Sequence, residues 1–202
     1  MMKDRTIDYY DNNSEDFIQT TKDVEFSETQ DKFIKELKNQ FSHEQISLLD
    51  FGCGSGRDTK YFLEKGFLVD AIDGSKEMCK FASTYTGIEV EHTSFQKYKT
   101  EKKFEGVWAC SSILHLNKSD LEEVFKKLAS ILKENGILYT SFKYSDFEGE
   151  RNGRYFTDFT SESFAQFNEK LGYFEISKEW VTSDVRPGRE GEKWLNLLLK
   201  KI

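Results

Sequence analysis

Short apolar runs alternate with amphipathic stretches along most of the chain. Five such runs cover residues 46–51, 67–73, 88–92, 104–110 and 137–142. Runs of this length are typical of strands buried in a sheet. Because the segments between them carry helical periodicity, the pattern predicts an α/β sandwich of three layers. Its centre would be a doubly wound, mostly parallel sheet with right-handed crossovers.

Helical periodicity marks the segments between the apolar runs. The clearest example opens at 119–122, carries apolar residues at spacings of 3, 4, 7 and 11, and is expected to end at Asn135-Gly136. A helix capped by Ser75 is expected to turn Met78 and Phe81 toward the core. The remaining helices are predicted from about Glu28, over 58–65 with Gly66 at the end, and over 161–171.

The last part of the chain has a different pattern. Residues 174–183 and 193–202 both predict extended strands, and the turn-rich stretch 184–191 joins them. Two strands joined by a short turn form an antiparallel hairpin rather than a strand–helix–strand unit. Before them, residues 144–156 mix glycine, charge and aromatic rings, so we expect a loop that is either a substrate loop or solvated surface.

Composition narrows the class of protein. With 202 residues, a net charge of −7 and an isoelectric point of about 5.2, the chain fits one acidic domain. An acidic surface repels phosphate backbones, so we expect no duplex nucleic-acid partner. No apolar stretch is long enough for a transmembrane helix, and no membrane association is expected. Three cysteines without a paired motif indicate reduced thiols and a cytoplasmic protein.

A glycine-rich turn follows the first apolar run. Gly52, Gly54 and Gly56 stand where a buried strand meets a helix, and the missing Cβ atoms allow a ligand to approach backbone N–H groups. Such a turn serves dinucleotides, nucleoside phosphates or S-adenosylmethionine, and it also occurs as a turn without a ligand. Asp73 ends the second strand about 20 residues further on, where a carboxylate can bind both hydroxyls of a ribose.

The spacing of the glycines distinguishes between these ligands. A dinucleotide fingerprint would require glycine at Arg57, and the chain has no Gly-Lys-Ser/Thr sequence of a P-loop. The carboxylate of Asp73 also repels a phosphate on the ribose. S-adenosylmethionine carries a ribose and no phosphate. It therefore agrees with the glycine spacing, with the missing P-loop and with the carboxylate of Asp73. A nicotinamide dehydrogenase is the competing class, and it would leave the terminal hairpin unexplained.

Two motifs resemble those of a known family. Residues 48–58, Leu-Leu-Asp-Phe-Gly-Cys-Gly-Ser-Gly-Arg-Asp, are similar to motif I of the class I (Rossmann-like) S-adenosylmethionine-dependent methyltransferases. Residues 69–75, Val-Asp-Ala-Ile-Asp-Gly-Ser, resemble their second motif, and the likeness extends over about 46–202. It implies seven strands in the order 3-2-1-4-5-7-6, with the seventh antiparallel. The nearest resemblance is to small-molecule methyltransferases of the tellurite-resistance type.

The resemblance also implies positions for the cofactor. The glycines at 52, 54 and 56 would line the methionine and ribose portion, with Asp50 near the sulfonium and Asp73 on the ribose diol. The expected contacts with the adenine and the methionine tail are Gly74, Ser75, Met78, Ser94, Phe95, Ala109 and Cys110. On helix spacing alone, a core position is the favoured explanation for Met78.

Candidates for the chemistry lie in the loops beyond the strands. His115 follows the fourth strand and is either a general base or a packed, hydrogen-bonded residue. Lys143, Arg154 and Tyr155 would contact the acceptor. Tyr10 would belong to an N-terminal lid that closes over the site. The other histidines have no neighbouring ligands, so we expect no metal site.

Missing motifs narrow the acceptor. The stretch 109–112, Ala-Cys-Ser-Ser, lacks the proline motifs of DNA methyltransferases, so the acceptor is expected to be a small molecule. A protein side chain, or an S-adenosylmethionine-binding partner without turnover, is the alternative. We expect one domain over 1–202, with a lid at 1–42, a cofactor half at 43–143 and a substrate half at 144–202. The oligomeric state stays open.

Overall fold

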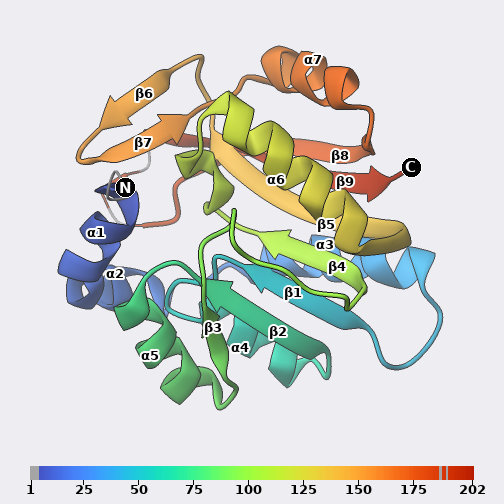
Figure 1. Ribbon diagram of the computed structural model, residues 1–202, viewed down its shortest axis with the longest axis horizontal. Helices are drawn as coiled ribbons and strands as arrows, with labels where there is room; N and C mark the ends of the chain where they lie inside the picture. The colour runs from blue at the N-terminus through green and yellow to red at the C-terminus, as the bar shows by residue number, and fades with distance from the viewer. Residues whose placement is uncertain (1–4, 187, 190) are drawn as a thin grey trace.

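A mixed β-sheet runs through the middle of the molecule, with helices on both of its faces (Figure 1). The structure is a computed structural model that describes residues 5–186, 188–189 and 191–202. Pro187 and Glu190, within the expected turn, lie outside the described residues, as do the first four residues of the expected lid.

The helices and strands alternate through the first two thirds of the chain. In chain order they are α1 (Arg5–Asn12), α2 (Ser14–Thr21), α3 (Ser27–Gln40), β1 (Ser47–Phe51), α4 (Arg57–Glu64), β2 (Leu68–Asp73), α5 (Lys76–Thr86), β3 (Val90–His92), β4 (Phe104–Ala109), α6 (Lys118–Ile131), β5 (Leu132–Lys143), β6 (Glu148–Arg151), β7 (Arg154–Thr157), α7 (Ser161–Leu171), β8 (Phe174–Ser183) and β9 (Lys193–Lys201). A 3₁₀ turn at Ile113–His115 follows β4.

The order of the strands defines the fold. The main sheet has seven strands in the order β3-β2-β1-β4-β5-β9-β8. Strands β1 to β5 pair in parallel, and β9 is antiparallel to both β5 and β8. This confirms the expected sandwich with one antiparallel strand. It differs in detail because β6 and β7 form a separate sheet of two strands.

The core lies on both faces of the sheet, which explains the continuous apolar runs. On one face, Phe33 of α3 and Phe62 of α4 pack against Trp108, whose ring stacks on Tyr139 at a centroid distance of 3.9 Å. On the other face, α6 and α7 pack their phenylalanines against β5. Strands β1 and β4 are buried along their whole length, as strands covered on both sides must be.

The segment expected as a loop contains a hairpin. Strands β6 and β7 pair in an antiparallel register that ends at Arg151 and Arg154. Asn152 and Gly153 form the turn, with φ of +53° and +75°. Asn-Gly is the sequence that a two-residue hairpin turn favours, since both of its residues adopt positive φ. The loop prediction was therefore wrong for this stretch, and the signal for the hairpin is present in the sequence.

Two smaller expectations also differ from the structure. Helix α6 ends at Ile131, four residues before the expected Asn135-Gly136, because β5 begins at once. In α5, Phe81 is only partly buried and stacks on Tyr85, while Cys79 takes the buried position. The Ser75 cap is confirmed, since its side chain accepts a hydrogen bond from the N–H of Met78.

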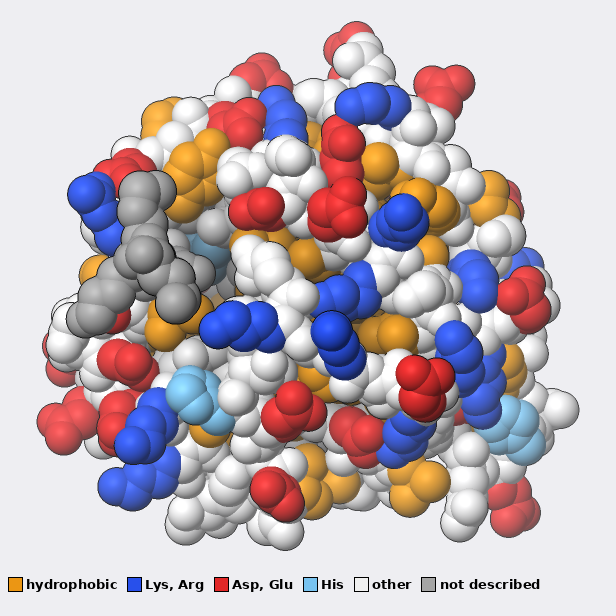
Figure 2. All heavy atoms as spheres, in the orientation of Figure 1, with side chains coloured by type: hydrophobic (Ala, Val, Ile, Leu, Met, Phe, Trp, Pro, Cys, Tyr) orange, Lys and Arg blue, Asp and Glu red, His pale blue; other side chains and the backbone are white. Residues whose placement is uncertain are grey.

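The short N-terminal helices lie outside the sandwich. In Figure 1, α1 and α2 stand beside α5 and the β6–β7 hairpin, at the carboxyl edge of the parallel strands. On the face that Figure 2 shows, charges of both signs surround small, separate apolar patches. Among the described residues, no helix combines the length and the apolar character needed to cross a bilayer.

Candidate active site

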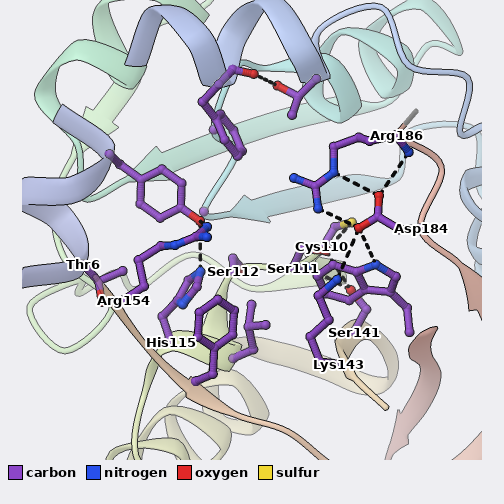
Figure 3. A pocket seen from close by; sticks show the side chains of 18 of the residues that line it. Thr6, Cys110, Ser111, Ser112, His115, Ser141, Lys143, Arg154, Asp184 and Arg186 are labelled. Carbon is purple, nitrogen blue, oxygen red and sulfur yellow. Dashed lines mark hydrogen bonds and ion pairs between the residues drawn. The ribbon is translucent and has the colours of Figure 1, made fainter. Parts of the chain in front are cut away.

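A cavity of about 600 Å³ opens at the carboxyl edge of the sheet. Its walls come from the ends of β1, β2, β4 and β5, from α1 and β7, and from the turn between β8 and β9. Figure 3 shows Arg154 and His115 on one side of the cavity and Lys143, Asp184 and Arg186 on the other. Ligands of open α/β sheets bind in this position, where the strand order reverses between β1 and β4.

The glycine turn forms the floor of the cavity. Gly52 has a φ of +90°, and a Cβ atom added there would lie 2.5 Å from the Cβ of Ser112. Gly54 has a φ of +54°, but its added Cβ would meet only the ring of Phe17, at 3.4 Å. Gly52 is therefore required by both conformation and space, whereas Gly54 is required by conformation and leaves room above its backbone.

Asp73 is held at the end of β2 by backbone groups. Its carboxylate accepts hydrogen bonds from the N–H of Gly54 at 2.9 Å and from the N–H of Ser75 at 2.8 Å. Burial raises its pKa, and these two N–H groups oppose that shift. The two bonds fix the carboxylate beside the glycine turn and leave oxygen lone pairs for hydroxyl donors.

Helices α1 and α2 cover this part of the cavity. Asp11 accepts a hydrogen bond from the Ser75 hydroxyl at 2.6 Å. A Cβ atom added at Gly74 would lie 3.0 Å from Ile7, so the side chain of Ile7 rests on the backbone at that point. Phe17 of α2 lies over Gly54 in the same way. The N-terminal segment therefore forms the roof above the glycine turn.

The same helix contributes to the opposite end of the cavity. The Tyr10 hydroxyl lies 2.9 Å from Nε2 of His115, and Arg154 donates to the hydroxyl at 3.3 Å. Nδ1 of His115 lies 2.7 Å from the carbonyl oxygen of Tyr155. Because a carbonyl oxygen only accepts, Nδ1 carries the proton and Nε2 accepts from Tyr10.

This environment keeps His115 neutral. Burial, together with the charges of the nearby Arg154 and Arg151, lowers the pKa of the imidazole to about 4, although the bond to Tyr155 acts in the opposite direction. Burial also raises the pKa of the Tyr10 hydroxyl. At neutral pH the histidine is thus a hydrogen-bond acceptor whose free nitrogen is covered by Tyr10.

An ionic cluster occupies the other side of the cavity. The Lys143 ammonium lies 3.2 Å from Asp184, contacts Glu192, and stands 3.8 Å from the ring centroid of Trp194. Arg186 donates two side-chain hydrogen bonds to Asp184. Burial raises the pKa of Asp184. The bonds from Arg186 and one from Trp194 outweigh this effect and hold that pKa well below its ordinary range.

The structure brings most of the expected site residues to this cavity. Those that line it are Tyr10, Gly52, Gly54, Asp73, Gly74, Ser75, Met78, Ser94, Phe95, Cys110, His115, Lys143 and Arg154. Four others do not line it: Asp50, Gly56, Ala109 and Tyr155. Asp50 is buried beneath the turn, where it accepts a hydrogen bond from Thr59 at 2.5 Å and burial raises its pKa to about 8.

Several lining residues were not expected from the sequence. Among them are Ile7, Phe17, Ser112, Ser141, Asp184 and Trp194. A partial signal existed for Asp184, since it follows the predicted strand 174–183 and stands two residues before an arginine. Ile7 and Phe17 had none, because the position of α1 and α2 depends on contacts between distant segments.

Residues 48–136, which hold the glycine turn and Asp73, match the family described as methyltransferase domain. In this segment the chain is therefore similar to that family, and its strand order is the one that the resemblance to class I methyltransferases implies. Two curated relatives match at similar identity. YqeM of Bacillus subtilis, named as a methyltransferase, is 31% identical over 141 residues, or 64% of this chain and 53% of that one. The ubiquinone biosynthesis O-methyltransferase of Pelagibacter ubique is 32% identical over 110 residues, covering 52% and 42%.

A solved structure matches over nearly the whole chain. The 1,6-didemethyltoxoflavin-N1-methyltransferase of Burkholderia thailandensis contains bound 1,6-didemethyltoxoflavin and S-adenosylhomocysteine. It superposes with a TM-score of 0.74 at 20% identity and covers 96% of this chain and 86% of that one. The present chain spans about half the length of the two curated relatives above. The likeness to the tellurite-resistance type stays a prediction.

Proposed function

We propose that this protein transfers a methyl group from S-adenosylmethionine to a small molecule. The observation that carries the proposal is a single cavity that joins the glycine turn and Asp73 to a second end containing His115 and Arg154. A volume of about 600 Å³ lies within the range of roughly 300–1,000 Å³ for small-ligand sites. Donor and acceptor can therefore lie next to each other in one cavity.

The residues at the β1–β2 end fit S-adenosylmethionine. Asp73 is aimed by two backbone N–H groups and would accept from the ribose hydroxyls. The exposed backbone at Gly52 and Gly54 would carry the ribose and methionine portion, and Met78 and Phe95 would flank the adenine. When bound, the cofactor supplies an electrophilic methyl carbon on its sulfonium.

The protein's own part in the reaction is alignment and the exclusion of water. Tyr10 of α1 covers His115, so α1 would shield part of a bound acceptor from solvent. The neutral His115 positions the Tyr10 hydroxyl and can accept a proton only after that hydroxyl moves. We assign His115 a positioning role for Tyr10 first, and that of general base second.

Further parts of the proposal concern organisation and setting. Residues 1–42 would act as a lid, 43–143 as the cofactor half and 144–202 as the acceptor half; the contacts of α1 with α5 and with β7 support this division. The free thiols of the three cysteines support a cytoplasmic enzyme. The negative charge of the chain disfavours nucleic acid as the acceptor.

A small acceptor is favoured over a protein side chain. Residues of α1 and β7 line the acceptor end of a cavity of about 600 Å³, a volume that suits a small molecule. The similar solved structure contains bound 1,6-didemethyltoxoflavin and S-adenosylhomocysteine, which supports such an acceptor.

Calorimetry with S-adenosylhomocysteine and with NAD tests the cofactor assignment. We expect heat of binding with the former and none with the latter. Asp73→Ala should weaken the binding by roughly 1–3 kcal/mol, the cost of losing charge-assisted hydrogen bonds to the ribose. Glu175→Ala, on the outer strand β8, is the control and should bind as wild type. Binding of NAD alone, or an Asp73→Ala variant that binds as tightly as wild type, would overturn the proposal.

A further inference from the structure

Positive side chains gather around the cavity although the whole chain is acidic. Among the described residues, seven lining side chains are cationic: Arg57, Lys143, Arg151, Arg154, Arg186, Arg189 and Lys193. Five lining side chains are anionic: Asp58, Asp73, Asp158, Asp184 and Glu192. Since the net charge of the chain is −7, the cavity has the opposite sign to the molecule that surrounds it.

Most of these cations already have a carboxylate partner. The pairs are Arg57 with Asp58, Arg151 with Asp158, Arg186 and Lys143 with Asp184, and Arg189 with Glu192. Lys193 is largely exposed and donates to Ser183. Arg154 is the exception inside the cavity: within the described part of the chain, its guanidinium donates to the neutral hydroxyl of Tyr10 and forms no ion pair.

The surroundings of Arg154 are aromatic. Its guanidinium carbon lies 4.4 Å from the ring centroid of Tyr9, 5.8 Å from that of Tyr10 and 5.2 Å from that of Phe156. Its Nε atom is buried and has no hydrogen-bond partner. Rings stabilise the charge through their π faces but leave the N–H donors unsatisfied. A buried donor without an acceptor is costly, so this guanidinium is prepared to bind an anion.

The charge balance selects the kind of anion. Asp158 also lines the cavity, and its carboxylate already accepts hydrogen bonds from Arg151 and Ser145. The guanidinium of Arg154, which has no ion-pair partner among the described residues, suits a single negative charge, whereas a phosphate dianion would need a second cation without a partner. The planar fork of an arginine also matches the geometry of a carboxylate.

The rest of this end of the cavity suits a flat, apolar body. Apolar and aromatic side chains around His115 and Arg154 line it: Tyr10, Leu114, Leu116 and Phe156. From these contacts we propose that the methyl acceptor is a small aromatic carboxylate whose acid group binds Arg154. The inference rests on the proposed function, since it names the class of molecule that occupies the acceptor end.

The test uses simple probes on the protein saturated with S-adenosylhomocysteine. Benzoate carries the proposed group, benzamide is its neutral counterpart, and phenyl phosphate carries the alternative anion. Calorimetry should show benzoate binding at least tenfold more tightly than either of the others. Arg154→Gln should weaken benzoate binding by about tenfold to a hundredfold, and Arg154→Lys should retain part of it. The binding of S-adenosylhomocysteine should be unchanged in both variants.

Arg5→Gln is the matched control. Arg5 joins α1 to the same hairpin through an exposed ion pair with Glu150, and it does not line the cavity. Exposed pairs contribute little, so this variant should bind benzoate as wild type. Equal binding of benzoate and benzamide, tighter binding of phenyl phosphate, or an Arg154→Gln variant with unchanged benzoate binding would each refute the inference. The proposed function fails separately, if S-adenosylhomocysteine itself does not bind.

Discussion

At the scale of single residues, neighbouring glycines of one motif perform different tasks. The sequence treats Gly52 and Gly54 alike, since both belong to the same turn. In the structure the first is packed against Ser112, and the second faces the cavity below Phe17. A motif therefore indicates where backbone must be free, but only the packing shows whether the fold or the ligand needs that freedom.

This difference predicts unequal effects of substitution. Gly52→Ala should destabilise the protein by well over 1 kcal/mol, because positive φ alone costs about 1–2 kcal/mol and the added Cβ also collides with Ser112. Gly54→Ala should cost about 1 kcal/mol and mainly weaken the binding of S-adenosylhomocysteine. Urea unfolding and calorimetry of both variants measure the two effects. Equal losses of stability would contradict this account.

The lowered pKa of His115 predicts how stability depends on pH. The ordinary histidine pKa of 6.5 falls to about 4 in the folded protein, so the folded state binds fewer protons than the unfolded state between these values. The contribution of the neutral His115 to the free energy of unfolding is fully present above pH 6.5 and is lost as the pH falls toward 4. It amounts to at most about 3 kcal/mol.

His115→Asn should remove this part of the acid sensitivity. The free energy of unfolding is measured at neutral pH and near pH 4.5 for both proteins, and the wild type should lose more. The raised pKa of Asp50 changes stability in the opposite direction, but it does so in both proteins. The difference between the two proteins therefore reports His115 alone. For the same reason, methyl transfer should not depend on this histidine's protonation above about pH 6. A histidine-dependent fall in rate near pH 6.5 would argue for an ordinary pKa.

At the scale of elements, the local sequence was sufficient to predict the bounds of a helix or strand where its end signals were strong. Helix α7 and strand β8 have the predicted bounds, since a Thr160 capping box and a left-handed Gly172 mark the ends of the helix. The β6–β7 hairpin was missed although its Asn-Gly turn is a strong signal. Its strands have few apolar residues and pair with each other, while β7 also contacts α1 and the 3₁₀ turn at Ile113–His115.

Helix α1 has no buried residues, so it contributes to the cavity wall rather than to the hydrophobic core. Removal of residues 1–12 should leave the melting temperature within a few degrees of wild type. The same truncation should weaken the binding of S-adenosylhomocysteine, because Ile7 and Asp11 no longer cover Gly74 and Ser75. Thermal unfolding and calorimetry check these two expectations. A large loss of stability would mean that α1 belongs to the core.

At the scale of the whole molecule, the topology located the site. The strand order reverses between β1 and β4, and the cavity lies at that point, as the resemblance to class I methyltransferases implied. The cofactor end was accessible to sequence reasoning because motif I and Asp73 are close in the chain. The acceptor end was not, because it combines α1, β7 and the region around Asp184, which are joined only by contacts between distant segments.

The double attachment of α1 has a kinetic consequence. One helix touches Ser75 at the cofactor end through Asp11 and His115 at the acceptor end through Tyr10. On the proposed function, a methyl donor bound at the glycine turn would lie beneath the same helix that forms part of the acceptor end. We therefore expect a sequential mechanism in which the methyl donor binds first and its demethylated product leaves last. In initial-rate kinetics, the demethylated product should then compete with the methyl donor for the free enzyme, and the methylated acceptor should leave before it.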